Sequence, residues 1–132
     1  MSDRKRKTKI LVIEHEENIR QVLIDILKNN GHKVETADDG LRGVELFEEK
    51  EFDLVLTDLG MPEMSGWKVA EKIKSINGRV PVILITGWNI EMDETELRER
   101  WVDLVIHKPF EIDQVIKLVK EGIALRERFK AL

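Results

Sequence analysis

Five short segments, most of them continuously apolar, recur along the chain, and each is followed by a segment whose apolar residues have helical spacing. Apolar runs without polar alternation are typical of strands buried on both faces of a parallel sheet. We expect strands at residues 10–13, 33–36, 54–56, 80–85 and 104–106. Alternating strands and helices predict an α/β domain with helices on both faces of the sheet, and right-handed crossovers leave few topologies.

The segments that follow these strands predict five helices, and residues that favour helix ends flank several of them. Gly31 suits a C-terminal cap and Ser65 suits an N-terminal cap. We interpret Asp38 and Asp39 as caps of the second helix instead of ligands. The fourth helix has few apolar positions and therefore offers little surface to a core. We expect the helices near residues 19–27, 40–47, 66–76, 93–100 and 112–129.

The chain has 132 residues, which suits one domain with a sizeable core, and we find no linker or second domain in its composition. It has no cysteine, which excludes disulfides, thiolate metal sites and a cysteine nucleophile. No segment is apolar enough to span a membrane or to act as a signal peptide. We therefore expect a cytoplasmic location and no membrane partner.

The formal net charge of −4 is unevenly spread along the chain. The first nine residues carry five basic side chains against Asp3, so the remaining residues carry −8. We interpret residues 1–8 as a basic, flexible tail and residues 9–132 as the folded domain. The acidic body predicts that this domain does not bind nucleic acid directly.

The stretch DLVLTDLGMPEMSG, residues 53–66, places a carboxylate at the carboxyl edge of the predicted sheet. Asp58 stands at the end of the third strand, and Gly60 and Pro62 then favour a turn. Open α/β sheets bind their ligands at this edge. The ends of the first, fourth and fifth strands bring further polar residues to the same edge, namely Glu14, His15, Thr86 and Lys108.

These side chains form a chemically coherent set. A carboxylate can act as a nucleophile toward phosphorus. Neighbouring acids can hold a divalent cation that neutralises charge on a transferring phosphoryl group. A hydroxyl can donate to a phosphoryl oxygen, and a lysine can pair with another as a point charge. The set therefore favours phosphoryl chemistry.

Four motifs in this order and at this spacing resemble the receiver domain of two-component response regulators: ILVIEHEENIR, DLVLTDLGMPEMSG, VPVILITG and HKPF. The resemblance covers about residues 9–124. It implies a doubly wound, flavodoxin-like fold with a five-stranded parallel sheet of strand order 2-1-3-4-5 and five helices, as in chemotaxis-type receivers.

The resemblance also implies a role for each site residue. Asp58 would accept a phosphoryl group from a phosphohistidine on a sensor histidine kinase or phosphotransfer protein. Thr86 would turn toward that group, Lys108 would pair with it, and the Lys108–Pro109 bond would be cis. Asp58, the backbone carbonyl of Gly60 and the acids after the first strand would hold Mg²⁺ or Mn²⁺. The domain would then switch contacts with a downstream protein effector, without turnover of a separate substrate.

The chain departs from the family pattern after the first strand, where receivers usually have two adjacent acids and this sequence has Glu14 and His15. His15 matches the acid that normally touches the metal, and imidazole is a poor substitute for the oxygen ligands of Mg²⁺. Three interpretations stay open: Glu14 reaches the metal while His15 points to solvent; His15 recruits a metal such as Mn²⁺ or Zn²⁺; or the metal site is weak and the receiver is slow or inert.

Two further positions bear on signalling. The family often has an aromatic residue three positions before the lysine, and here Val105 stands there, so a switch would depend on Thr86 and on the fourth helix. Trp88 lies two residues after Thr86 and is interpreted either as a partly buried loop aromatic or as a shield over an acyl phosphate. His32 and His107 are interpreted as surface residues. Receivers often form homodimers, and no charge pattern here selects for or against one.

Other functional classes fit the residues less well. A flavin-binding domain would need a loop rich in small residues after the first strand, where this chain has EHEEN. A phosphatase of the haloacid-dehalogenase type would need a second acid where Gly60 stands. A pseudo-receiver that binds proteins without phosphorylation remains the alternative, because of the Glu14–His15 pair.

Overall fold

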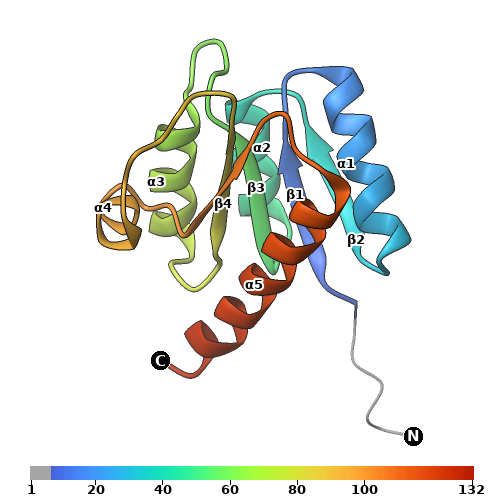
Figure 1. Ribbon diagram of the computed structural model, residues 1–132. Helices are drawn as coiled ribbons and strands as arrows, with labels where there is room; N and C mark the ends of the chain where they lie inside the picture. Colours follow the sequence, from blue (N-terminus) through green and yellow to red (C-terminus); the bar gives the residue numbers. More distant parts are fainter. Residues whose placement is uncertain (1–6) are drawn as a thin grey trace, which may run out of the picture.

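The computed structural model describes residues 7–132, so most of the predicted basic tail, residues 1–8, lies outside the described residues. Five parallel strands form one sheet in the order β2-β1-β3-β4-β5 (Figure 1). This result confirms the predicted doubly wound fold. The strands are β1 (Lys9–Ile13), β2 (Lys33–Ala37), β3 (Leu54–Asp58), β4 (Val82–Thr86) and β5 (Leu104–His107).

Five helices follow the strands and cover both faces of the sheet, as predicted (Figure 1). α1 and α5 pack on one face, and α2, α3 and α4 pack on the other. No helix among the described residues is long and apolar enough to cross a bilayer. The helices are α1 (Glu17–Asn29), α2 (Gly40–Glu49), α3 (Gly66–Ile76), α4 (Glu94–Glu99) and α5 (Ile112–Lys130).

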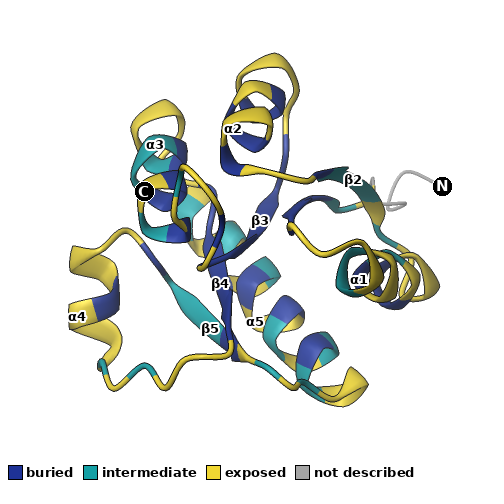
Figure 2. Cartoon of the chain, turned by 90° about the horizontal axis from the view of Figure 1, so that it is seen from above, coloured by how far each residue is buried: buried dark blue, intermediate teal, exposed yellow. Residues whose placement is uncertain are grey.

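The alternation of side chains along each strand divides the core into two layers. On β1, Ile10 and Val12 face α1 and α5, whereas Leu11 and Ile13 face α2 and α3. Every residue of β3 and β4 is buried, which explains why β3 is apolar up to Thr57 and Asp58 and β4 is apolar up to Thr86. Figure 2 shows that each helix buries one side against the sheet and exposes the other, and that α4 is mostly exposed.

The helix caps follow the sequence signals with one exception. Asp39 and Ser65 accept hydrogen bonds from the backbone of the first turns of α2 and α3. Asp93 forms a capping box with Glu96 at the start of α4. Asp38 does not cap α2 and is exposed, because Asp39 is the residue with extended backbone that directly precedes the helix.

The two largest errors in the predicted strand ends are two residues each, at the end of β3 and at the start of β4. β3 includes Asp58, which pairs in register with Ile85 of β4. β4 begins at Val82 and not at residue 80, because Pro81 has no backbone N–H to donate to a neighbouring strand. Asp58 therefore projects from a rigid strand end instead of from the following loop.

Gly66 allows α3 to begin against the carboxyl end of β3. A Cβ at this position would collide with the backbone oxygen of Asp58 and would lie 2.9 Å from Leu59 Cα. Because backbone atoms cannot yield as a flexible side chain can, we expect Gly66→Ala to lower the free energy of unfolding by about 1–3 kcal/mol in urea denaturation. Gly78→Ala is the matched control, because its Cβ would approach only Lys74 O at 3.4 Å. Equal stability of the two variants would contradict this assignment.

His32 is half-buried between α1 and α5, which corrects the prediction of a surface residue. It lines a small cavity together with Asn30, Lys120 and four aliphatic side chains, Ile26, Leu27, Ile116 and Val119. Burial lowers the pKa of His32 below its usual value of 6.5. No local pattern predicts this burial, because the cavity forms only where α5 packs beside α1.

The lowered pKa makes folding stability depend on pH. The folded state favours neutral His32. The stabilisation that buried, neutral His32 gives the folded state is therefore fully present above the unfolded pKa of 6.5, and it is lost as the pH falls through the lowered pKa. We expect His32→Gln to reduce the fall in melting temperature between pH 7 and pH 5, the range around an ordinary histidine pKa of about 6.5. His107→Gln, at an exposed position, should leave that fall unchanged.

Candidate functional site

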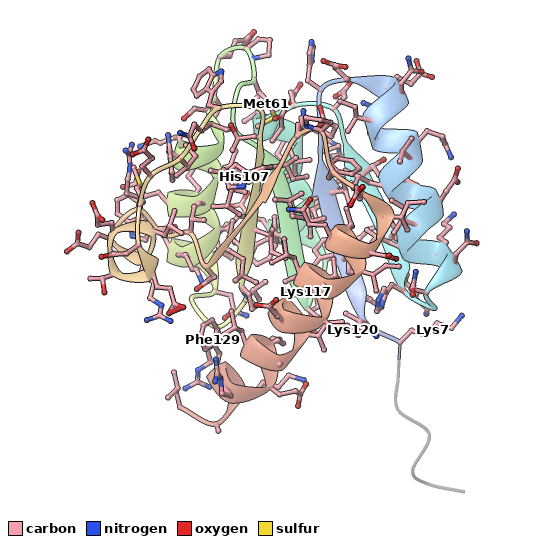
Figure 3. The ribbon with its side chains drawn as sticks, viewed as in Figure 1. Lys7, Met61, His107, Lys117, Lys120 and Phe129 are labelled. Atoms are coloured by element: carbon pink, nitrogen blue, oxygen red, sulfur yellow. The ribbon has the colours of Figure 1, made fainter. Side chains whose placement is uncertain are left out.

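The predicted polar residues meet at the carboxyl edge of the sheet. Asp58 and Thr86 are the last residues of β3 and β4, Glu14 directly follows β1, and Lys108 directly follows β5. In Figure 3, Met61 marks this edge at the top of the view, and Phe129 of α5 lies at the opposite end. Strand order places β1 and β4 on either side of β3, so Asp58 is central.

Lys108 joins two acids from different strands. Its ammonium nitrogen lies 3.2 Å from Glu14 Oε1 and 3.3 Å from Asp58 Oδ1. The Lys108–Pro109 peptide bond is cis, as expected. The side chain of Lys108 is 20% exposed, that of Asp58 is 10% exposed and that of Glu14 is fully buried. The cluster is therefore open to solvent mainly on the side of Asp58 and Lys108.

The charges in this cluster shift each other's proton affinity. Burial raises the pKa of Glu14, and the negative charge of Asp58 raises it further, against the Glu16 backbone N–H and Lys108. Burial alone would lower the pKa of Lys108, but the attraction of Glu14 and Asp58 raises it overall. Lys108 is therefore held firmly as a cation beside two carboxylates.

Thr86 lies beside the cluster, and its contact with it is through the backbone and not through its side chain. Its backbone oxygen accepts a 2.7 Å hydrogen bond from the backbone N–H of Lys108. Its Oγ1 accepts a 2.9 Å hydrogen bond from the backbone N–H of Trp88, and the residue is 2% exposed. An accepting hydroxyl still has its own proton to donate. Thr86 is thus next to Asp58, with a donor that a ligand there could use.

The structure does not bring His15 into the cluster. His15 is exposed and lines an open groove between the loops after β1, β2 and β3, together with Asp38, Asp39 and Glu63. Gly60 is also exposed, and a Cβ on it would meet only the ring of Trp88, at 3.8 Å. Trp88 is 64% exposed, so the interpretation as a partly buried loop aromatic is wrong.

The loop after β1 is held by contacts that sequence reasoning missed. Arg20 Nη1 donates to the backbone oxygen of Glu14 at 2.9 Å. Glu14 Oε2 accepts from the backbone N–H of Glu16 at 3.0 Å. These contacts fix the Glu14 carboxylate in its buried position. Arg20 ends the motif ILVIEHEENIR, but the motif does not predict this contact, because it depends on how α1 packs against the loop.

The residues present fit a magnesium ion. Glu14 Oε1 is buried and lies 3.2 Å from Lys108 Nζ, but no donor among the described residues is well oriented for a hydrogen bond to it, so this oxygen can accept a further partner. Mg²⁺ is commonly held by one or two carboxylates with water and phosphate oxygens, and Glu14 and Asp58 supply two carboxylates. Within residues 7–132, no three His, Cys, Asp or Glu side chains group as a metal site.

This arrangement suits the stabilisation of a transferring anion. A carboxylate, an adjacent lysine and a threonine lie together where three strands end, and the neighbouring acid can share a cation with that carboxylate. The walls are rigid strands, so the groups are held before any ligand arrives.

Known proteins share the sequence pattern and the fold of this chain. A family model described as the response regulator receiver domain matches residues 10–120. The regulatory protein AtoC of Escherichia coli is 33% identical over 125 residues, which are 94% of this chain and 27% of that protein. The chain spans about half or less of the length of the curated relatives it matches first.

Solved structures share the fold. A CheY-like receiver domain protein of Methanospirillum hungatei superposes with a TM-score of 0.86 at 24% identity, over 93% of this chain and 98% of that one. The receiver domain of the sensor histidine kinase PA1611 of Pseudomonas aeruginosa superposes with a TM-score of 0.80 at 22% identity, over 90% and 99%. The latter is described with a magnesium ion coordinated in its active-site cleft. Matched along most of its length, this chain belongs to the response regulator receiver domain family of two-component signalling.

Proposed function

We propose that Asp58 accepts a phosphoryl group from a phosphohistidine of a sensor histidine kinase or phosphotransfer protein. The observation that carries this proposal is the contact of Lys108 Nζ with Asp58 Oδ1, 3.3 Å, at the solvent-facing side of the cluster. Asp58 is 10% exposed and Lys108 is 20% exposed, so solvent reaches this contact at the carboxyl edge of the sheet. Phosphorylation would then change contacts with a downstream protein effector.

The transfer step uses residues that the fold already holds in place. An Asp58 oxygen attacks phosphorus, the P–N bond of the phosphohistidine breaks, and the imidazole nitrogen keeps the electron pair. Lys108 pairs with one phosphoryl oxygen and Thr86 donates its hydroxyl proton to another. The product is an aspartyl phosphate on this chain, so the domain is proposed as a signalling acceptor and not as an enzyme with a separate substrate.

We further propose that Glu14 and Asp58, with the backbone carbonyl of Gly60, hold Mg²⁺. The bound ion would neutralise negative charge on the phosphoryl oxygens. The buried Glu14 oxygen without a well-oriented donor supports this role, and the exposed position of His15 supports the interpretation in which His15 points to solvent. Mn²⁺, with a similar preference for oxygen, is the expected substitute.

A metal titration separates Glu14 from His15. We expect Glu14→Gln to weaken Mg²⁺ binding about tenfold, which corresponds to about 1.4 kcal/mol, because it removes one of two anionic ligands. His15→Ala should bind Mg²⁺ as the wild type does. Binding is followed by tryptophan fluorescence. If His15→Ala abolished binding and Glu14→Gln did not, the proposed ligand set would be wrong.

The phosphodonor protein would approach over an apolar groove beside the site. Lys108 lines both the groove and the acidic cluster, and the other lining residues are Asn18, Ile19, Val22, Pro109 and Phe110. Val22 is 46% exposed, although it is an aliphatic residue. The acidic body supports protein partners without direct contact to nucleic acid, and we propose that the domain acts in the cytoplasm.

The direct test is incubation with acetyl phosphate followed by intact mass measurement. With Mg²⁺ or Mn²⁺ we expect the gain of one phosphoryl group, and with EDTA we expect none. The second candidate function is a pseudo-receiver that binds proteins without phosphorylation, which the lack of a second acid directly after Glu14 favours. No phosphoryl gain with either metal would support that alternative.

A further inference from the structure

Arg20 reaches back from the first turns of α1 to the loop that precedes this helix. Its side chain is half-buried, and its Nη1 donates to the backbone oxygen of Glu14 at 2.9 Å and to that of His15 at 3.5 Å. The backbone N–H of Arg20 donates to Glu16 O at 2.9 Å, so the residue itself is fixed at the start of the helix. Arg20 therefore holds the peptide groups on both sides of His15.

The backbone and side chain of Glu14 are held by three segments of the chain. Its backbone N–H donates to Ala37 O at the end of β2, at 3.1 Å. Its backbone oxygen accepts from Arg20, and its Oε2 accepts from the backbone N–H of Glu16 at 3.0 Å. Of these three contacts, the one from Arg20 has a side-chain donor, so a substitution can remove it and leave the other two donors in place.

We propose that Arg20 is a positioning residue for magnesium, which holds the loop so that the Glu14 carboxylate stays inside the cluster and the His15 imidazole stays outside it. The inference rests on the proposed function, in which Glu14 and Asp58 hold Mg²⁺. A glutamate side chain has one more rotatable bond than an aspartate and so loses more conformational freedom when it binds a cation. A loop that is held in one conformation removes part of this cost before the cation arrives.

The charge of Arg20 and its hydrogen bonds have opposite effects on a bound cation. A guanidinium repels a nearby Mg²⁺, so a role of charge alone predicts tighter Mg²⁺ binding when Arg20 is removed. A positioning role predicts weaker binding, because the group that orients a metal ligand is lost. The direction of the change in affinity therefore identifies the role of Arg20.

The test titrates the metal-free protein with MgCl₂ and follows binding by tryptophan fluorescence. We expect Arg20→Ala to bind Mg²⁺ about three- to tenfold more weakly than the wild type, up to the lower end of the effect usual for groups that orient metal ligands. Arg20→Lys keeps the charge and one donor group, and its affinity should lie between the two. Lys28→Ala is the matched control, because it removes the same charge from an exposed position in the last turn of α1 and should not weaken binding.

A double variant shows whether Arg20 acts through Glu14. When Arg20→Ala is added to Glu14→Gln, we expect Mg²⁺ affinity to fall by less than about a further twofold, because the ligand that Arg20 positions is already impaired. Independent effects would instead multiply. A substitution that only lowered stability would shift the melting temperature and leave the Mg²⁺ affinity of the folded protein unchanged.

Each outcome decides one question. Equal or tighter Mg²⁺ binding by Arg20→Ala, with Glu14→Gln weakened, overturns the role of Arg20 and leaves the proposed ligands intact. Effects that multiply in the double variant also overturn it, because Arg20 would then act on another group. A wild type that binds no Mg²⁺ refutes the proposed metal site and the inference together. Thermal melting without metal checks that each variant is folded. If Arg20→Ala does not fold, Arg20→Lys takes its place in both comparisons, and wild-type affinity then overturns the proposal.

Discussion

Asp58→Asn is expected to abolish the gain of a phosphoryl group from acetyl phosphate and Mg²⁺. An amide oxygen is neutral and is a far weaker nucleophile than a carboxylate, and it also contributes less to binding of a divalent cation. The fold should persist, because an amide oxygen can still accept from Lys108, which lies 3.3 Å from Asp58 Oδ1. Intact mass measures the loss, and circular dichroism confirms that the variant is folded.

Asp38→Asn is the matched control for this experiment. Asp38 is an exposed carboxylate near the same edge of the sheet, and the change removes the same charge without touching the cluster. It should take up a phosphoryl group as the wild type does. Uptake by Asp58→Asn that equals that of Asp38→Asn would place the acceptor elsewhere and would refute the assignment of Asp58.

Asp103→Ala is expected to lower the free energy of unfolding by about 3–5 kcal/mol, the usual effect of removing one partner from a buried ion pair. Asp103 Oδ2 lies 2.8 Å from Lys74 Nζ, and the two side chains are 5% and 14% exposed. The same oxygen accepts from the backbone N–H of Val82 at 2.9 Å. The variant therefore leaves a buried ammonium and the first N–H of β4 without this acceptor.

The ion pair between Lys68 and Glu71 is the control for Asp103. It lies on the same helix as Lys74 and spans 3.2 Å, but its side chains are 55% and 41% exposed. Solvent screening limits such pairs to about 0–1 kcal/mol, so Glu71→Ala should be nearly neutral in urea denaturation. A similar loss of unfolding free energy in Asp103→Ala and Glu71→Ala would mean that burial does not decide the strength of the Lys74–Asp103 contact.

The order of strands and helices was predictable because it depends on local patterns. The continuous apolar runs of β1, β3 and β4 indicate strands buried on both faces, and Asp39 and Ser65 mark helix starts by a bond within their own first turn. Errors arose where one residue depended on a neighbouring strand. β4 begins later than its apolar run, and β3 extends to Asp58 because Asp58 pairs with Ile85.

The candidate site was predictable as a set of residues but not as a geometry. The rule that parallel strands end at one edge predicts that Asp58, Thr86 and Lys108 are neighbours. It does not predict that Glu14 is fully buried while His15, the next residue, is exposed. That difference comes from Arg20 and Glu16, which hold the loop after β1 in one conformation.

The sequence by itself determined the fold class, the family and the residues able to carry phosphoryl chemistry, because periodicity, caps and motifs act over a few neighbouring positions. Only the tertiary structure decided which of them touch. Lys108 meets Glu14, Trp88 faces Gly60, and His32 enters a cavity under α5. Each of these contacts joins segments far apart along the chain, and the crossovers and the close fit of side chains between layers fix their distance.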